Sequence, residues 1–355
     1  MLKLNPLLYC LLILFVASWK FSDTAEPPTK TCLELVENDV DENATDPEVF
    51  GFMKEPSKRE LIKYEPSSGR WVELTENLPA SRNCFLIAGE EFYVGGETGL
   101  FKASMDGDDL SFYKEPILNG PVFDIQTTEM GSVYISTLES GVLFRPDFTG
   151  FWIKAYPNLT KTTIFNIWED KSGTVLVGGS KGIHMSKDNG KSWTHRWDGN
   201  HASGFAKVGK TYYAASGNGI LASSDNGYTW NKDYELTGNV SVIKAEDKKA
   251  VAVIFVERDP KTYGPEERAS SSIHLLNPNT KKWMDISRTL PDYKTINDAI
   301  ILNDEIYCST TAGVFKSKDN GKTWEMVLKS NDEVWAYSFR SYKGVLYMLK
   351  GFNGC

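Results

Sequence analysis

The sequence contains little of what metal sites and nucleic-acid interfaces need. It has only four histidines, at scattered positions, and its five cysteines include no C-x-x-C pair, so we predict no zinc site. Basic residues are fewer than acidic ones, 39 against 47, and the formal charge of −8 argues against a nucleic-acid partner. We therefore expect no metal, no cofactor and no bound nucleic acid.

Long apolar runs are also scarce. One run, Leu7–Ser18, follows Lys3 and stops before Lys20, and it is too short to span a bilayer comfortably. We interpret residues 1–25 as a secretory signal peptide, the alternative being an uncleaved membrane anchor. No second apolar stretch of the length that a membrane helix needs follows it, so we predict a secreted mature chain without a membrane span.

Other features fit the secretory route. Three N-x-S/T sequons predict N-glycans on exposed loops, at Asn43, Asn158 and Asn239. After Cys10 leaves with the signal peptide, the remaining cysteines are disulfide candidates in an oxidising compartment, and the sequence does not choose among their pairings. For Cys308 the alternative to a disulfide is a buried free thiol. The disulfide candidates are Cys32, Cys84, Cys308 and Cys355.

The chain divides into three parts. After the signal peptide, residues 26–58 are acidic and rich in proline, and they lack a clean hydrophobic period. We predict an extended N-terminal arm there, tethered through Cys32, or else a solvated tail without a role. Residues 59–355 form the third part, which a repeated motif organises.

The repeated motif is S-x-D-x-G-x-x-W, which occurs three times, each time after an apolar stretch and a glycine turn. The Asp carboxylate can accept hydrogen bonds from backbone N–H groups about two residues on, and the Gly permits a positive φ. The Trp can bury its ring between sheets. We interpret these residues as structural clamps of β-hairpins: Ser186, Asp188, Gly190 and Trp193; Ser223, Asp225, Gly227 and Trp230; Ser317, Asp319, Gly321 and Trp324.

Aromatic residues that close such units recur at steps of 37 to 53 residues. This spacing is typical of a four-stranded propeller blade. We predict an all-β, seven-bladed β-propeller of antiparallel blades, with six blades as the alternative. Residues 60–71 supply two outer strands and residues 333–350 two inner strands of one blade, so that the termini close the ring. The aromatics are Trp71, Phe112, Trp152, Trp193, Trp230, Trp283 and Trp324.

Tandem motifs of this kind resemble those of the Asp-box (BNR) repeat proteins. That group includes sialidases, xyloglucan-directed glycosidases, sortilin-type receptor ectodomains and photosystem II assembly factors, so the resemblance implies a propeller over residues 59–355 but no single activity. Sialidases of the group carry an Arg-Ile-Pro motif, which this sequence lacks, and an arginine triad. Arginine is scarce between the motifs, where the loop candidates are Arg82, Arg258, Arg268, Arg288 and Arg340.

We therefore expect a secreted glycoprotein that binds an extracellular protein or glycan, and no enzymatic activity. The alternative is a sialidase- or xyloglucanase-like glycoside hydrolase, which would need two opposed carboxylates. Candidate ligand-binding residues at the starts of the innermost strands are Arg82, Asn83, Asp124, Asn166, Asp298 and Trp335. For these positions the alternative role is hydrogen bonding to channel water or backbone.

A second group of candidates lies in the insertion that explains the 53-residue step. By its place in the repeat it joins the second and third strands of a blade, and long loops in compact domains are usually functional or disordered. The candidates there are Glu257, Arg258, Tyr263 and Arg268. The sequence does not identify the ligand or the oligomeric state.

Overall fold

The computed structural model describes residues 60–352, apart from short gaps. The predicted signal peptide, the acidic arm, Asn43, Asn158, Cys32 and Cys355 lie outside the described residues. Within them, no helix has both the length and the apolar character that crossing a bilayer requires. The gaps are 75–77, 80–83, 106–109, 117–119, 128–131, 138–140, 146–150, 155–158, 160–162, 171, 189, 191, 200, 236–237, 258–268, 292–294 and 331–334.

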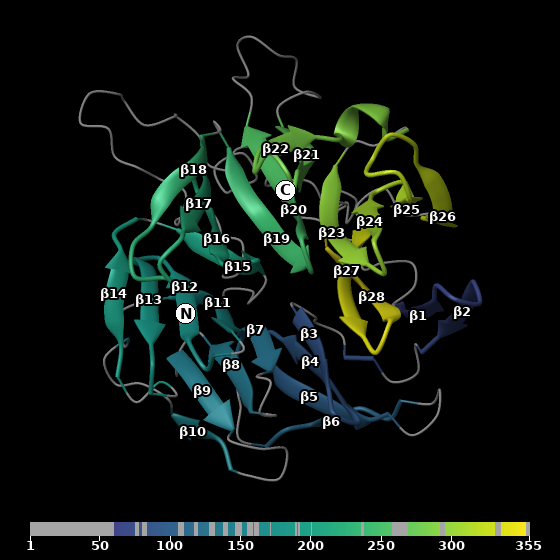
Figure 1. Cartoon of the computed structure of the whole chain (residues 1–355). Coiled ribbons are helices and arrows are strands. Elements are labelled where there is room, and N and C mark those ends of the chain that lie inside the picture. The colour runs from purple at the N-terminus through teal and green to yellow at the C-terminus, as the bar shows by residue number, and fades with distance from the viewer. Residues whose placement is uncertain are drawn as a thin grey trace, which may run out of the picture.

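The described strands form seven antiparallel sheets of four strands each, arranged as blades around a ring (Figure 1). This confirms the predicted propeller and its seven blades. Six blades follow chain order: β3–β6 (Cys84–Ala88, Glu91–Gly96, Gly99–Ser104, Tyr113–Lys114), β7–β10 (Val122–Thr127, Val133–Thr137, Gly141–Arg145, Ile153–Lys154), β11–β14 (Ile164–Glu169, Val175–Gly179, Gly182–Ser186, Thr194–Trp197), β15–β18 (Ala202–Val208, Thr211–Ser216, Gly219–Ser223, Asn231–Glu235), β19–β22 (Asn239–Glu246, Lys249–Glu257, Ala269–Leu276, Trp283–Asp285) and β23–β26 (Ile296–Leu302, Glu305–Thr310, Gly313–Ser317, Glu325–Lys329).

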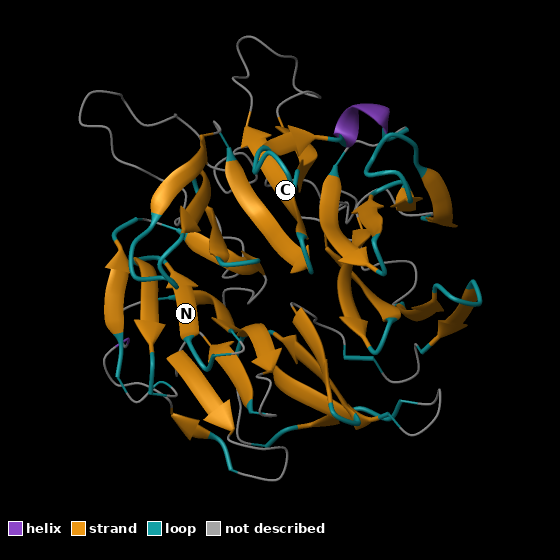
Figure 2. Cartoon of the chain, in the orientation of Figure 1, coloured by secondary structure: helices purple, strands orange, loops and turns teal. Residues whose placement is uncertain are grey.

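The seventh blade combines the two ends of the described chain. Its order is β27 (Trp335–Tyr342), β28 (Val345–Phe352), β1 (Leu61–Glu65) and β2 (Arg70–Glu73), with β1 antiparallel to β28. The predicted closure by terminal strands is therefore confirmed. Because every blade now has two neighbours, the ring has no open side that would expose an unpacked blade. A 3₁₀ turn lies at Ser287–Thr289 (Figure 2).

The hydrophobic core consists of seven clusters, one between each pair of neighbouring blades. In each cluster the closing aromatic of one blade packs on the blade before it. Trp283, for example, contacts Tyr213 of the preceding blade, with ring centroids 5.7 Å apart. Large aromatic rings bury more apolar surface than other side chains. These aromatic residues therefore lie between sheets, as the sequence predicted.

The three S-x-D-x-G-x-x-W motifs share a hydrogen-bond pattern at the turn between the third and fourth strands. The Ser223 hydroxyl donates to Asp225 Oδ1 at 2.7 Å and accepts the Gly227 N–H at 2.9 Å. Asp225 also accepts the backbone N–H and the hydroxyl of Thr229, at 2.9 and 2.6 Å. The carboxylate therefore bonds four residues on, rather than the two that we predicted, because the loop is wider than a simple Asx turn.

The glycine and tryptophan of each motif complete the clamp. Gly190, Gly227 and Gly321 have φ of 74°, 85° and 82°, the left-handed conformation that the sequence predicted. The indole of Trp230 donates to Gly227 O at 3.1 Å, whereas Trp324 donates to Thr289 Oγ1 at 3.2 Å. These side chains bond within their own turns or to a neighbouring turn, and the motif aspartates do not line the central cavity described below.

The buried hydroxyl of the motif gives the first prediction. Ser223→Ala removes the acceptor of the Gly227 N–H, which lies in a buried position, so we expect the free energy of unfolding to fall by about 1–3 kcal/mol. The matched control is Ser224→Ala, because Ser224 is the adjacent serine and is exposed. Denaturant unfolding measures both variants. Equal stability of the two would contradict a structural role for the motif.

The structure corrects two predictions, disulfide bonding of Cys84 and Cys308 and an exposed loop at Asn239. Cys84 and Cys308 are buried free thiols in separate core clusters, so they do not pair with each other, and the alternative of a free thiol at Cys308 is confirmed. Asn239, predicted on an exposed loop, instead begins β19 and pairs with Phe255. The sequon tripeptide carries no information about backbone conformation, which is why the setting was predicted wrongly.

Candidate functional site

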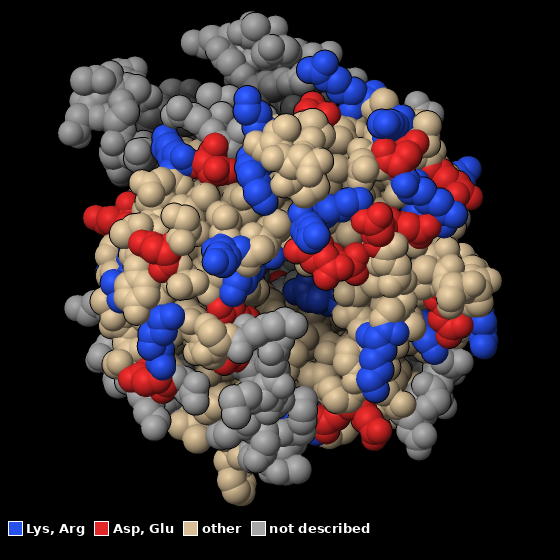
Figure 3. Space-filling model, in the orientation of Figure 1, with Lys and Arg blue, Asp and Glu red and all other residues tan. Residues whose placement is uncertain are grey.

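The innermost strands of all seven blades surround a cavity of about 940 Å³. Figure 3 shows the corresponding hollow at the centre of the ring, with a basic side chain inside it. Its volume lies within the range of small-ligand pockets. Lining residues, one from each inner strand in ring order, include Leu86, Gln126, Asn166, Ala206, Lys244, Asp298 and Arg340.

Five inner strands carry a register shift near their start, after the first residue in β7, β11, β15 and β23 and after the second residue in β19. Such a β-bulge re-aims the side chains that follow it. The next paired residue is Asp124 in β7, Asn166 in β11 and Asp298 in β23. The sequence placed Asp124 and Asn166 at equivalent repeat positions and Asp298 more loosely. The register makes all three equivalent.

Asp124 joins two neighbouring inner strands. Its Oδ2 accepts the Asn166 side-chain amide at 2.8 Å and the Ile167 backbone N–H at 3.2 Å, both from β11. Gln126 Nε2 lies 3.3 Å from each carboxylate oxygen. Burial raises the pKa of Asp124 to about 6, while the nearby Arg340 and these hydrogen bonds oppose the rise. The carboxyl group is thus half-ionised at about pH 6.

Lys244 and Asp298 form a buried ion pair across three inner strands. The Lys244 ammonium on β19 lies 2.7 Å from both oxygens of Asp298 on β23, and 3.0 Å from the Phe339 carbonyl on β27. Asp298 also accepts the backbone N–H groups of Phe339 and Ala299, each at 2.7 Å. Burial lowers the pKa of Lys244 to about 8, and the Asp298 carboxylate opposes that shift. Both charges are satisfied within the protein.

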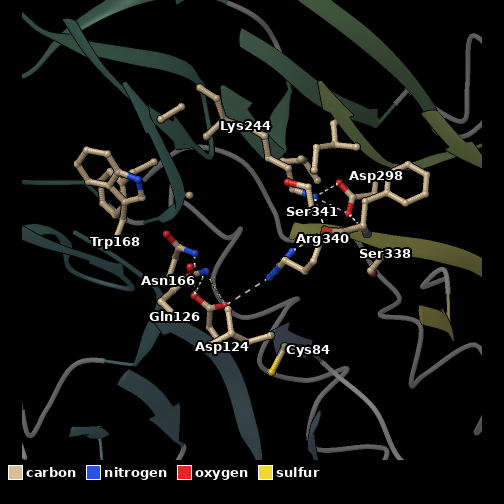
Figure 4. Close-up of a pocket in the computed structure, with 18 of the residues that line it drawn as sticks. Cys84, Asp124, Gln126, Asn166, Trp168, Lys244, Asp298, Ser338, Arg340 and Ser341 are labelled. Atoms are coloured by element: carbon tan, nitrogen blue, oxygen red, sulfur yellow. Dashed lines mark hydrogen bonds and ion pairs between the residues drawn. The ribbon is translucent and has the colours of Figure 1, made fainter. Parts of the chain in front are cut away.

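Arg340 is a cavity charge whose guanidinium is only partly engaged by the protein. Its Nη1 donates to the Phe339 carbonyl at 3.0 Å, and its Nη2 lies 3.9 Å from Asp124 Oδ1, beyond hydrogen-bond distance. The guanidinium lies over the Phe85 ring, 5.6 Å from its centroid, and the side chain is 26% exposed. Figure 4 shows it crossing the cavity toward Asp124. A guanidinium carries several more N–H donors than these contacts use.

The structure brings three of the predicted ligand-binding residues into one cavity: Asp124, Asn166 and Asp298. The two carboxylates bond to the backbone of the next inner strand, as the alternative role predicted. For Trp335 and Glu257 only the backbone is described, at the start of β27 and the end of β20. Glu257 pairs with Ala269, so the insertion joins the second and third strands, as predicted. Outside the described residues lie Arg82, Asn83, Arg258, Tyr263 and Arg268.

Sequence reasoning missed Gln126, Lys244 and Arg340 as members of the site. Arg340 was predicted in a loop, but it lies within the inner strand β27. Gln126 and Lys244 each stand two residues beyond the residue that follows the register shift in their strand, and alternate residues of a strand point to the same side. Counting two residues on from these positions would have found Gln126 and Lys244. Among the residues that the structure describes, no group of three or more His, Cys, Asp or Glu side chains is placed to hold a metal ion.

Comparison with solved structures finds propellers of different activities. YCF48 bound to a D1 peptide is 15% identical, with a TM-score of 0.53 over 76% of this chain and 93% of that one. A GH74 xyloglucanase from Xanthomonas campestris is 13% identical, with a TM-score of 0.58. The match covers 83% of this chain but only 57% of the enzyme. Virginiamycin B lyase from Staphylococcus aureus is 11% identical, with a TM-score of 0.55 over 82% of this chain and 99% of the lyase.

No protein-family model matches the chain, and no curated protein matches it in sequence. The identities to the solved structures are so low that the likeness extends to the fold alone. That fold is shared by a peptide-binding protein and by enzymes. The chain is therefore a seven-bladed β-propeller whose activity has to be argued from its own central cavity.

Proposed function

We propose that the chain is a secreted Asp-box propeller that binds an extracellular protein without catalysis, by taking a segment of that protein into the central cavity. The observation that carries this proposal is Arg340, a partly exposed guanidinium with open donors in a cavity where Lys244 and Asp298 satisfy each other. Arginine is among the residues that most often anchor protein interfaces. The peptide bound to the structurally similar YCF48 supports a peptide ligand for this fold.

The surrounding structure suits a rigid receptor. Asp124, Asp298 and Lys244 bond to backbone groups of neighbouring inner strands, so the walls of the cavity are cross-linked around Arg340. A preorganised cavity loses little conformational entropy on binding. The predicted secretion and N-glycans belong to the same proposal, and N-terminal sequencing of the protein recovered from culture medium tests the cleavage after residue 25.

Arg340→Gln tests the proposal directly. We expect this variant, used as bait in a pull-down from extracellular fluid, to lose a protein that the wild type retains. Arg288→Gln is the matched control, because Arg288 is 87% exposed at the 3₁₀ turn and does not line the cavity. Identical sets of retained proteins for all three baits would contradict a cavity-based binding function, as would specific retention on a glycan array.

The second candidate is a glycoside hydrolase. One observation favours it: Asp124 faces the cavity with its pKa raised to about 6, as a general acid requires. Against it, Asp298 bonds to Lys244 and to two backbone N–H groups, which leaves it poorly placed to serve as an opposed base or nucleophile. We expect no turnover of a fluorogenic glycoside panel between pH 5 and 7. Hydrolysis that Asp124→Asn abolishes would establish the enzyme instead.

A further inference from the structure

We infer that the group recognised in the cavity is a carboxylate of an acidic peptide segment, which Arg340 binds through its open N–H donors. This inference rests on the proposed function and adds the chemistry of the ligand. It starts from the geometry of the guanidinium, whose planar fork of donors matches the two oxygens of a carboxylate. The Phe85 ring beneath the guanidinium, 5.6 Å away, holds that plane in the cavity.

The charges around Arg340 favour an anionic ligand. Lys244 is neutralised by Asp298 at 2.7 Å, so its charge is not available to a ligand. Asp124 is the anion that pairs with Arg340, and it stands 3.9 Å away while its other contacts are to Asn166, Gln126 and Ile167. A ligand carboxylate can approach the guanidinium more closely than Asp124 does. Charge-assisted pairs of this type are among the stronger hydrogen bonds.

Long-range attraction does not account for such binding. The chain has a formal charge of −8, so an acidic peptide is repelled by the protein as a whole. Binding then requires a specific local receptor, and it should depend on one residue rather than on the overall charge. This makes the effect of replacing Arg340 alone informative.

Two sources can supply the carboxylate. One is another protein, and the other is this chain, whose residues 34–48 contain seven acidic side chains and no Lys or Arg. The described chain begins at Glu60, whose carbonyl accepts the Lys350 N–H near the end of β28. That end of the blade is where the inner strand β27 starts, since Trp335 pairs with Phe352. The dozen residues between 48 and 60 can span roughly 40 Å when extended, which is enough to reach the ring centre.

The test uses a labelled synthetic peptide of residues 34–48 and a control peptide with all its acids changed to amides. Each is titrated by fluorescence anisotropy against the full chain and against the full chain in which those seven acids are replaced by Gln or Asn. Arg340→Gln, Arg340→Lys and the control Arg288→Gln are made in both backgrounds. Thermal unfolding confirms that each variant is folded.

We expect the acidic peptide to bind at least about tenfold more weakly to Arg340→Gln than to Arg288→Gln, and the amide peptide not to bind. Arg340→Lys should be intermediate, since it keeps the charge but loses the fork. If neutralising residues 34–48 strengthens peptide binding, the chain's own segment is the occupant; if it has no effect, the ligand is another protein. Equal binding to Arg340→Gln and Arg288→Gln, or no binding in either background, would overturn the inference. The pull-down could still succeed in that case, which separates this failure from a failure of the proposed function.

Discussion

Replacement of Lys244 by methionine is expected to lower the free energy of unfolding by about 2–3 kcal/mol. Removing one partner of a buried ion pair leaves the other charge uncompensated, which costs about 3–5 kcal/mol when the pair is fully buried. Lys244 is 22% exposed and Asp298 6%, so solvent reduces that cost. Asp298 would keep its two backbone N–H donors but lose the ammonium that contacts both of its oxygens.

A double-mutant cycle separates the ion pair from simple packing. In the Asp298→Asn background, Lys244→Met should cost much less, because no buried carboxylate is left unpaired. Lys318→Met is a suitable control, since Lys318 lies 3.6 Å from Glu305 and its side chain is 67% exposed. Exposed pairs contribute about 0–1 kcal/mol. Urea unfolding of the four proteins of the cycle measures the coupling, and a Lys244→Met protein as stable as the wild type would show that solvent already screens this pair.

The architecture followed from the sequence because its signals are local. Apart from the Trp324 indole, which bonds to Thr289, each S-x-D-x-G-x-x-W motif forms its hydrogen bonds within about seven residues, so the turn can be read without knowing its neighbours. The closing aromatics then repeat with the length of one blade, which fixed seven blades and the pairing of β1 with β28. Repetition converted weak local patterns into a reliable count.

The cavity could be predicted only in part because its partners are distant in the sequence. Lys244 bonds to Asp298, 54 residues on, and to Phe339, 95 residues on, so no local pattern marks the contact. Arg340 reaches Asp124 across the intervening strand β3. The bulges that align Asp124, Asn166 and Asp298 are set by pairing with the second strand of each blade. Repeat positions can be read from the sequence, but not which charges neutralise one another around the ring.

Affinity for the acidic peptide is expected to rise about tenfold as the pH falls from 7.5 to 5. Burial raises the pKa of Asp124 to about 6, so its carboxyl is ionised at pH 7.5 and protonated at pH 5. The ionised Asp124 carboxylate attracts the Arg340 guanidinium and repels the ligand carboxylate. The protonated, neutral carboxyl group does neither. Like charges about 6 Å apart at an effective dielectric constant of about 20 interact by more than 1 kcal/mol, which is enough for a tenfold effect.

The shifted pKa values of Lys244 and His201 do not predict this pH dependence. Lys244 stays charged below its pKa of about 8, and burial lowers the pKa of His201, which packs against Phe165, further from neutrality. Asp124→Asn should therefore bind the peptide at pH 7.5 as tightly as the wild type does at pH 5, with little change between the two. His201→Gln should retain the full pH dependence. If Asp124→Asn instead keeps the wild-type pH profile, the peptide or another group titrates, and Asp124 does not control access to Arg340.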